Sequence, residues 1–195
     1  MTTGILLFDD AEELDFAGPW EVLTAAAMLK GEGRVGSIAE HDRPVRCAKG
    51  MRVVPDHTFA DAPPRDVVLV PGGQGTRREE ENPVLLDWLA STGRRARWVT
   101  SVCTGAGLLA ACGLARGKRI TSHWAYLDVL RSRDDVTVVA HRRYVRDGNL
   151  VTAAGVSAGI DMALWLVGAE YDPEFARQVQ RWIEYDPAPP YAADA

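Results

Sequence analysis

The sequence predicts an α/β fold with a mostly parallel central sheet. Short, continuous apolar runs alternate along the chain with longer segments of helical periodicity, which is the pattern of such folds. The runs at 4–8 and 66–70 are apolar at nearly every position, as in parallel strands that are buried on both faces. The 195 residues show no repeat, low-complexity linker or shift in composition, so we predict one domain over residues 1–195.

The strands are predicted from apolar and β-branched runs that turn residues bound on either side. The Asp147-Gly148-Asn149 sequence is a strong signal for a hairpin between two of them. We expect strands at 4–8, 34–40, 66–70, 98–102 and 119–121, a hairpin or edge excursion at 45–55, and further strands around the turn within 136–152.

The helices are predicted from apolar residues at helical spacing and from prolines suited to a first turn. Pro19 follows Gly18, and a proline at the first helical position loses no hydrogen bond. This interpretation makes Gly18 the cap and places Asp15 ahead of the helix. We expect helices at 18–30, 82–95, 106–112, 157–168 and 173–185, and one that follows Trp124 and ends near 132.

Cys103 lies at the most informative point of the sequence, between the strand at 98–102 and the helix at 106–112. A thiol at such a turn matches a nucleophile elbow, with sulfur in place of the serine oxygen. The Thr-Gly-Ala-Gly run that follows permits a tight bend that packing alone does not require. The start of a helix is also expected to favour the thiolate. We therefore predict that Cys103 is a nucleophile, and that Cys47 and Cys112 are ordinary thiols.

Several other candidates fall at the same edge of the predicted sheet. The backbone of Gly72 and Gly73, with the N–H of Thr104, can form an anion site beside the sulfur, although the two glycines also suit a simple turn. Asp15 has apolar neighbours, which raise the pKa of a carboxyl and suit it to proton transfer, and a capping role is equally open. His123 can line the pocket at this edge, but we favour a structural role for it.

Composition and charge narrow the class of protein. A net charge of -5 and a pI near 5.4 argue against nucleic acid as a partner. The three cysteines and four histidines lack the spacing of a metal site, and no apolar run reaches membrane-spanning length. Sparse cysteines and the lack of a recognisable signal peptide lead us to expect a cytoplasmic protein with reduced thiols that acts on a small molecule.

Five motifs resemble the isonitrile hydratase branch of the ThiJ/PfpI superfamily, over about residues 4–191. They are LLFDDAEELDFAGPWEVL, VVLVPGG, VTSVCTGAGLLAACGLARGKRITSHWAY, VRDGNLVTAAGVSAGID and VQRWIEYDPAPPY. The resemblance implies a flavodoxin-like three-layer sandwich, similar to class I glutamine amidotransferases, that forms a homodimer without metal or organic cofactor. It also implies that Cys103 is the nucleophile, that Asp15 is the acid hydrogen-bonded to it, and that the backbone of Gly73 and Thr104 binds the anion.

The activity that this resemblance implies is the hydration of isonitriles, R–N≡C, to N-substituted formamides, a lyase reaction. The protease-like members have a histidine directly after the cysteine, and Thr104 at that position argues against peptidase activity. Two alternatives stay open. One is a glyoxalase-like or deglycase-like activity on glyoxal-type carbonyls. The other is a non-catalytic thiol sensor or regulator, like the domains fused to AraC-type helix-turn-helix modules.

Overall fold

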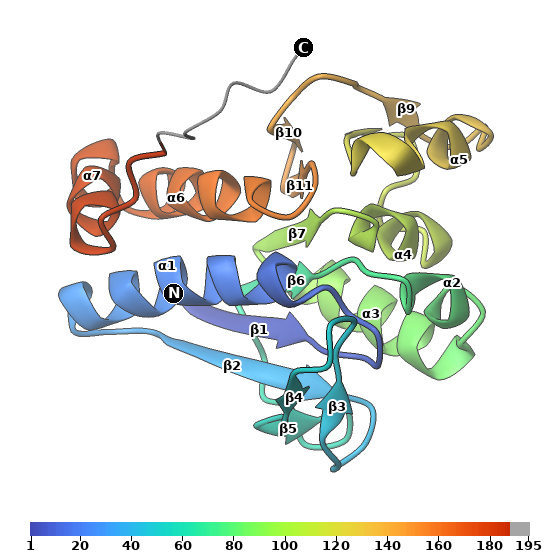
Figure 1. Cartoon of the computed structure of the whole chain (residues 1–195), viewed down its shortest axis with the longest axis horizontal. Coiled ribbons are helices and arrows are strands. Elements are labelled where there is room, and N and C mark those ends of the chain that lie inside the picture. The colour runs from blue at the N-terminus through green and yellow to red at the C-terminus, as the bar shows by residue number, and fades with distance from the viewer. Residues whose placement is uncertain (188–195) are drawn as a thin grey trace.

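The computed structural model describes residues 1–187, and a seven-stranded sheet forms its centre (Figure 1). Every neighbouring pair of strands is parallel except the pair at one edge. The predicted α/β fold with a mostly parallel sheet is thereby confirmed. In spatial order the strands are β10 (Tyr144–Asp147), β11 (Leu150–Ala153), β7 (Trp98–Val102), β6 (Val67–Val70), β1 (Thr2–Leu6), β2 (Arg34–Ala39) and β5 (His57–Thr58).

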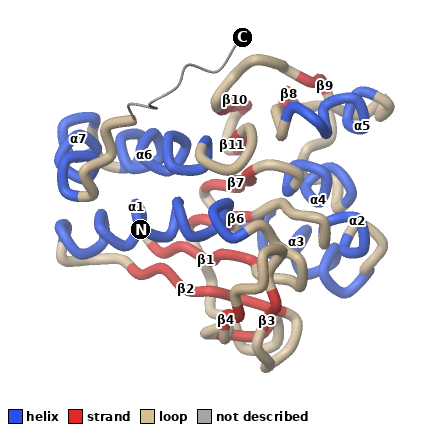
Figure 2. Tube along the Cα trace, viewed as in Figure 1, coloured by secondary structure: helices blue, strands red, loops and turns tan. Residues whose placement is uncertain are grey.

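Helices cover both faces of this sheet and produce three layers (Figure 2). One layer consists of α1 (Glu13–Lys30), α6 (Ala158–Glu170) and α7 (Pro173–Trp182). The other contains α3 (Pro83–Arg95) and α4 (Gly105–Ala111), with the shorter α2 (Thr76–Glu79) and α5 (Leu127–Arg131) beside them.

Strand β6 shows why the apolar runs are continuous. Val68 and Val70 pack with side chains of α3 and α4, whereas Val67 and Leu69 face the layer of α1 and α6. All four residues are fully buried, because successive side chains of a strand point to opposite faces and both faces are covered.

Two short ladders lie outside the main sheet. Strand β3 (Val45–Arg46) pairs with β4 (Arg52–Val53) in the expected hairpin. Strand β8 (Arg119–Ile120) pairs in parallel with β9 (Thr137–Val138), so the hairpin around residues 147–149 consists of β10 and β11 alone. Neither β5 nor α2 is predicted from the sequence, because segments this short carry no periodic signal. The helix expected to follow Trp124 forms as the 3₁₀ helix η1 (Trp124–Tyr126) continued by α5.

Helix α1 begins at Glu13, so the prediction of a start at Gly18 is wrong. Pro19 lies in the second turn of the helix, and contacts with distant segments hold the turn that precedes it. Glu13 Oε1 accepts a backbone N–H from the turn between β3 and β4 (2.7 Å), and Asp15 Oδ2 accepts the N–H of Gly72 (2.8 Å). Asp15 therefore belongs to the first turn of α1, and its side chain is tied to the end of β6.

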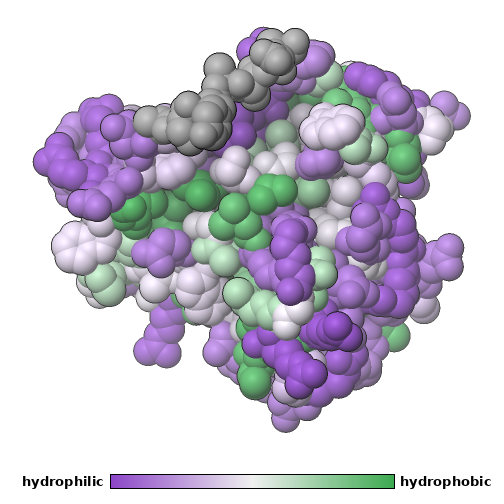
Figure 3. Space-filling view, viewed as in Figure 1, coloured by the Kyte–Doolittle hydropathy of each residue, from purple (hydrophilic) through white to green (hydrophobic). Residues whose placement is uncertain are grey.

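The surface of the molecule has an apolar region where α1 and α6 lie side by side (Figure 3). None of the helices within residues 1–187 is long and apolar enough to cross a membrane. The end of the fifth sequence motif, at 188–191, and the end of the predicted domain, at 188–195, lie outside the described residues.

Candidate active site

Cys103 joins β7 to α4 in a backbone conformation that residues other than glycine seldom adopt. Its φ is +57°, and strain of this kind is typical of a nucleophile elbow. The N–H of Cys103 donates to the carbonyl of Ala154 (2.7 Å), and its own carbonyl accepts a hydrogen bond from Ser122 Oγ (2.6 Å). These bonds hold the thiol at the carboxyl edge of the sheet, where the residue is only 7% exposed.

Asp15 lies beside this thiol and is completely buried. Its Oδ2 accepts the N–H of Gly72, whereas Oδ1 has no hydrogen-bond donor among the described residues. Burial raises the pKa of Asp15 to about 7, and the hydrogen bond from Gly72 offsets only part of that shift. A carboxyl with this pKa exchanges its proton readily in neutral solution, which suits an acid and base.

The thiol of Cys103 does not have the lowered pKa that its place before a helix predicts. Burial, and next the negative charge of Asp15, raise the pKa of Cys103 to about 12, against the opposing effect of two backbone N–H groups. Desolvation outweighs the dipole of α4, a helix of only 7 residues. Over a wide range above neutral pH, the pair therefore holds one proton on sulfur and one negative charge on Asp15.

The backbone donors that face the thiol differ from those predicted. The N–H of Gly72 is bonded to Asp15, and that of Gly73 donates to Thr104 Oγ1 (3.0 Å), so both are already engaged. The N–H of Thr104, which was predicted, and that of Val156, which was not, instead lower the pKa of the thiol. Val156 was not predicted, because a backbone donor leaves no mark on residue type. Its only signal was its position just after the strand that neighbours β7.

Val156 presents this N–H from a strained conformation. Its φ is +49°, which is rare for a β-branched residue. The same N–H lowers the pKa of both Asp15 and Cys103. A donor shared in this way stabilises negative charge on whichever of the two groups carries it.

Gly72 provides the space in which the thiol and its helix pack. A Cβ at this position would lie 2.5 Å from the backbone nitrogen of Thr104 and 2.8 Å from the Cβ of Cys103. We expect Gly72→Ala to lower the free energy of unfolding by about 1–3 kcal/mol, the usual cost of overpacking, as measured by urea denaturation. The control is Gly168→Ala, whose Cβ would meet its nearest neighbour at an ordinary 3.4 Å. Equal stability of the two variants would show that Gly72 is not needed for this packing.

The raised pKa of Asp15 also predicts how the free energy of unfolding depends on pH. The folded protein binds this proton more tightly than the unfolded chain, so the stabilisation is complete below about pH 4 and is lost as the pH rises through 7. Asp15→Asn should therefore be more stable than the parent above pH 7, by on the order of 4 kcal/mol at 1.36 kcal/mol per pKa unit. The difference should shrink to near zero at about pH 4. Urea denaturation across this range tests it, and parallel stability curves would contradict it.

His123 stands at the same edge of the sheet. Its Nδ1 accepts the N–H of Ala125 (3.3 Å) and so caps η1. The ring lies against Gly155, where a Cβ would come within 2.2 Å of His123 Cδ2. His123 also lines a hollow of about 370 Å³ next to Val156, which is the position expected if His123 is part of a binding pocket.

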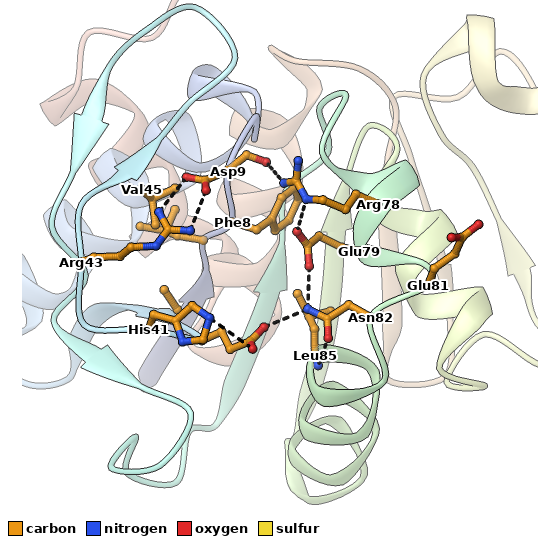
Figure 4. A pocket seen from close by; sticks show the side chains of 13 residues that line it. Phe8, Asp9, His41, Arg43, Val45, Arg78, Glu79, Glu81, Asn82 and Leu85 are labelled. Carbon is orange, nitrogen blue, oxygen red and sulfur yellow. Dashed lines mark hydrogen bonds and ion pairs between the residues drawn. The ribbon is translucent and has the colours of Figure 1, made fainter.

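A second hollow, of about 500 Å³, lies at the carboxyl ends of β1 and β2 (Figure 4). Its polar side chains bond mainly to one another. The Asn82 amide donates to Glu40 (2.8 Å) and Glu79 (2.9 Å), and Arg78 donates to the carbonyl of Asp9 (2.7 Å). The bond from Arg78 ties the turn between β1 and α1 to α2, and the bonds from Asn82 link the start of α3 to the end of β2 and to α2. No group of His, Cys, Asp and Glu side chains within residues 1–187, here or elsewhere, is placed to hold a metal ion.

Comparison with known proteins adds four findings to this geometry. The chain matches the model of the DJ-1/PfpI family over residues 2–169. It is 42% identical to the isonitrile hydratase of Pseudomonas putida over 96% of this chain and 80% of that protein. It is 30% identical to the HTH-type transcriptional regulator GbdR of Pseudomonas aeruginosa over 94% of this chain and 50% of the regulator. The crystal structure of a ThiJ/PfpI family protein from Pseudomonas syringae aligns with a TM-score of 0.91 and 34% identity, over 100% of this chain and 78% of that one.

Proposed function

The chain belongs to the DJ-1/PfpI family and has its flavodoxin-like fold, and from this premise we propose that it is a lyase that hydrates isonitriles to N-substituted formamides. The identity to the P. putida isonitrile hydratase supports an enzyme. The observation that carries the proposal is the buried pair of Asp15 and Cys103, in which the carboxyl has a pKa of about 7 and one free oxygen. Such a pair supplies both a nucleophile and a transferable proton.

In the first step, Cys103 Sγ bonds to the terminal carbon of R–N≡C while Asp15 takes the proton from the thiol. That carbon becomes negative as sulfur adds, and Asp15 returns the proton to it. The product is a thioimidate, Cys–S–CH=N–R, and the carboxylate is regenerated. The N–H groups of Thr104 and Val156 stabilise the negative charge that moves across the site.

In the second step, Asp15 accepts a proton from water while the oxygen of the water attacks the thioimidate carbon, and Asp15 then passes that proton to the nitrogen, which regenerates the carboxylate. The tetrahedral carbon then carries sulfur, hydroxyl and NH–R. When the C–S bond breaks, the hydroxyl proton passes through Asp15 to sulfur, which releases R–NH–CHO and the free thiol. The reaction consumes one water and restores both groups.

The narrow access to the thiol fits this substrate class. Cys103 is 7% exposed, so only a slender group can reach its sulfur. An isonitrile presents a linear N≡C head whose reacting carbon is terminal, and it meets this requirement without displacing the surrounding backbone.

Incubation with one aliphatic and one aromatic isonitrile, followed by chromatographic detection of the formamides, tests the proposal. We expect both formamides to form in proportion to enzyme concentration. Methylglyoxal in a parallel assay tests the carbonyl-directed alternative. Conversion of methylglyoxal alone, or reversible oxidation of Cys103 without turnover of either substrate, would replace our proposal with one of the two alternatives.

We also propose that the protein works as a homodimer through an apolar surface beside α1. Leu14, Met51 and Val54 are exposed there, next to a groove of about 430 Å³ that Phe16 and Trp20 help to line. The surface adjoins the apolar region where α1 and α6 meet (Figure 3). Because the proposed acid lies between two of these residues of α1, a second copy seated here would close the site from solvent.

Light scattering at micromolar concentration is expected to give the mass of a dimer. Val54→Glu should convert the protein to a monomer, because Val54 is 66% exposed on this surface and a carboxylate buried in a dimer contact is costly. The matched control is Val84→Glu, since Val84 is 54% exposed on α3 in the opposite layer. A monomeric parent protein with full activity would contradict this assembly.

A further inference from the structure

A hollow of about 370 Å³ opens at the edge of the sheet where β7 and β11 end. One side is formed by His123, Trp124 and Leu127, from η1 and the start of α5. Another side is formed by residues 141–143, which lead into β10, and a third by residues 154–156, which follow β11. Three segments from distant parts of the chain thus surround it.

Residues that line the hollow interact with Cys103. Val156 lines the hollow, and the N–H of Val156 lowers the pKa of the Cys103 thiol. Ser122 also lines it and donates its hydroxyl to the carbonyl of Cys103 (2.6 Å). A molecule attached at the sulfur can therefore place the rest of its atoms in this space.

The indole of Trp124 gives the hollow an uncovered aromatic surface. Trp124 is 79% exposed, although it stands beside a buried reactive centre. Its ring lies 5.5 Å from that of His123 at a tilt of 36°, and Leu127 adds a buried apolar side chain nearby. A planar aromatic group bound here would cover apolar surface that water otherwise contacts.

The charge of the hollow is positive. Arg143 is paired with Asp161 (2.6 Å), whereas Arg142 forms no ion pair with any residue in 1–187. None of the described residues that line the hollow is acidic. In a chain with a net charge of -5, this unpaired guanidinium is a local site for an anion, and a carboxylate fits its planar donors.

We propose that this hollow binds the substituent R of the isonitrile and selects aromatic substituents that carry a carboxylate. The indole of Trp124 packs on the ring, and Arg142 pairs with the carboxylate, while the isonitrile carbon reaches Cys103. This inference rests on the proposed hydration of isonitriles and assigns the class of substrate that the site accepts.

The test compares kcat/KM for methyl, benzyl and 4-carboxybenzyl isonitrile. The parent enzyme should prefer the 4-carboxybenzyl compound. Trp124→Ala should lower the ratio of benzyl to methyl activity about tenfold, because only the larger substrate contacts the indole. Arg142→Gln should lower the ratio of 4-carboxybenzyl to benzyl activity about fivefold. The control Trp182→Ala, at a tryptophan 57% exposed on α7, should change neither ratio.

Unchanged ratios in both variants, or an equal loss for all three substrates, would overturn the assignment of the hollow while leaving hydration itself in place. If the parent hydrates no isonitrile, the proposed function fails separately, and the hollow is then tested by calorimetric titration with N-(4-carboxybenzyl)formamide. Binding that Trp124→Ala and Arg142→Gln both weaken supports the hollow as a binding site. Equal binding to all variants, or no binding to any, overturns it.

Discussion

Cys103→Ala is expected to lower the rate of isonitrile hydration by at least about 10⁴-fold, the scale of loss when a covalent nucleophile is removed. Without Sγ no thioimidate can form, and water must attack the isonitrile directly. The fold should survive, because the substitution deletes one atom and alanine has the same backbone preferences at this position. Formamide formation measures the loss, and circular dichroism checks the fold.

Cys103→Ser should be nearly as inactive as the alanine variant. The hydroxyl keeps the shape of the side chain, but its proton is much harder to remove, and a carboxylate with a pKa of about 7 is too weak a base for it. Cys47→Ala is the matched control, since Cys47 is also a buried free thiol and should be dispensable. A Cys103→Ala protein that hydrates isonitriles at the parent rate would rule out the covalent mechanism.

Asp15→Asn is expected to reduce hydration by up to about 10⁴-fold, the upper range for general acid and base catalysis. An amide cannot carry a proton between sulfur, carbon and water. Asp15→Glu keeps the acid but lengthens it by one methylene in a position with no exposure. A displacement of about 1 Å can cost roughly a hundredfold in rate, so glutamate should be severely impaired.

The pH dependence of kcat/KM provides a second test of the role of Asp15 in proton transfer. The thiol can give up its proton only to the carboxylate form of Asp15, so activity should rise with pH and level off above about 7. The residual activity of Asp15→Asn should lack this rise. If Asp15→Asn hydrates isonitriles at close to the parent rate, the proton shuttle is wrong and the sensor or carbonyl-directed function gains support.

The sheet could be predicted because its signal is local and strong. The run at 67–70 is apolar throughout, and all four residues of β6 are buried. The start of α1 could not be predicted in this way. Pro19 favours a first turn at its own position, but Glu13 and Asp15 make contacts with segments far along the chain, and these extend the helix. A local preference gives no information about such contacts.

Some parts of the candidate site could likewise be predicted from the sequence, and others could not. Cys103 and Asp15 could be singled out because their chemistry depends on residue type and on their positions after strands. The backbone N–H of Val156 could not be singled out in this way, because every residue except proline has a backbone N–H. The partner of Gly73 could not be predicted for a related reason, since its N–H donates to the hydroxyl of Thr104. Which acceptor a backbone N–H meets depends on atomic positions at the ångström scale, and residue types alone do not give these positions.

The position of β7 between β6 and β11 has a consequence for the order in which a newly synthesised chain acquires its parts. The ribosome releases β7 well before β11, so β7 is at first the edge of the sheet, with unpaired backbone groups that can recruit another chain. Until residues 150–156 follow, the Cys103 backbone lacks its partner Ala154, and the thiol lacks the N–H of Val156. A nascent chain that stops in this interval exposes an apolar strand beside an unrestrained cysteine.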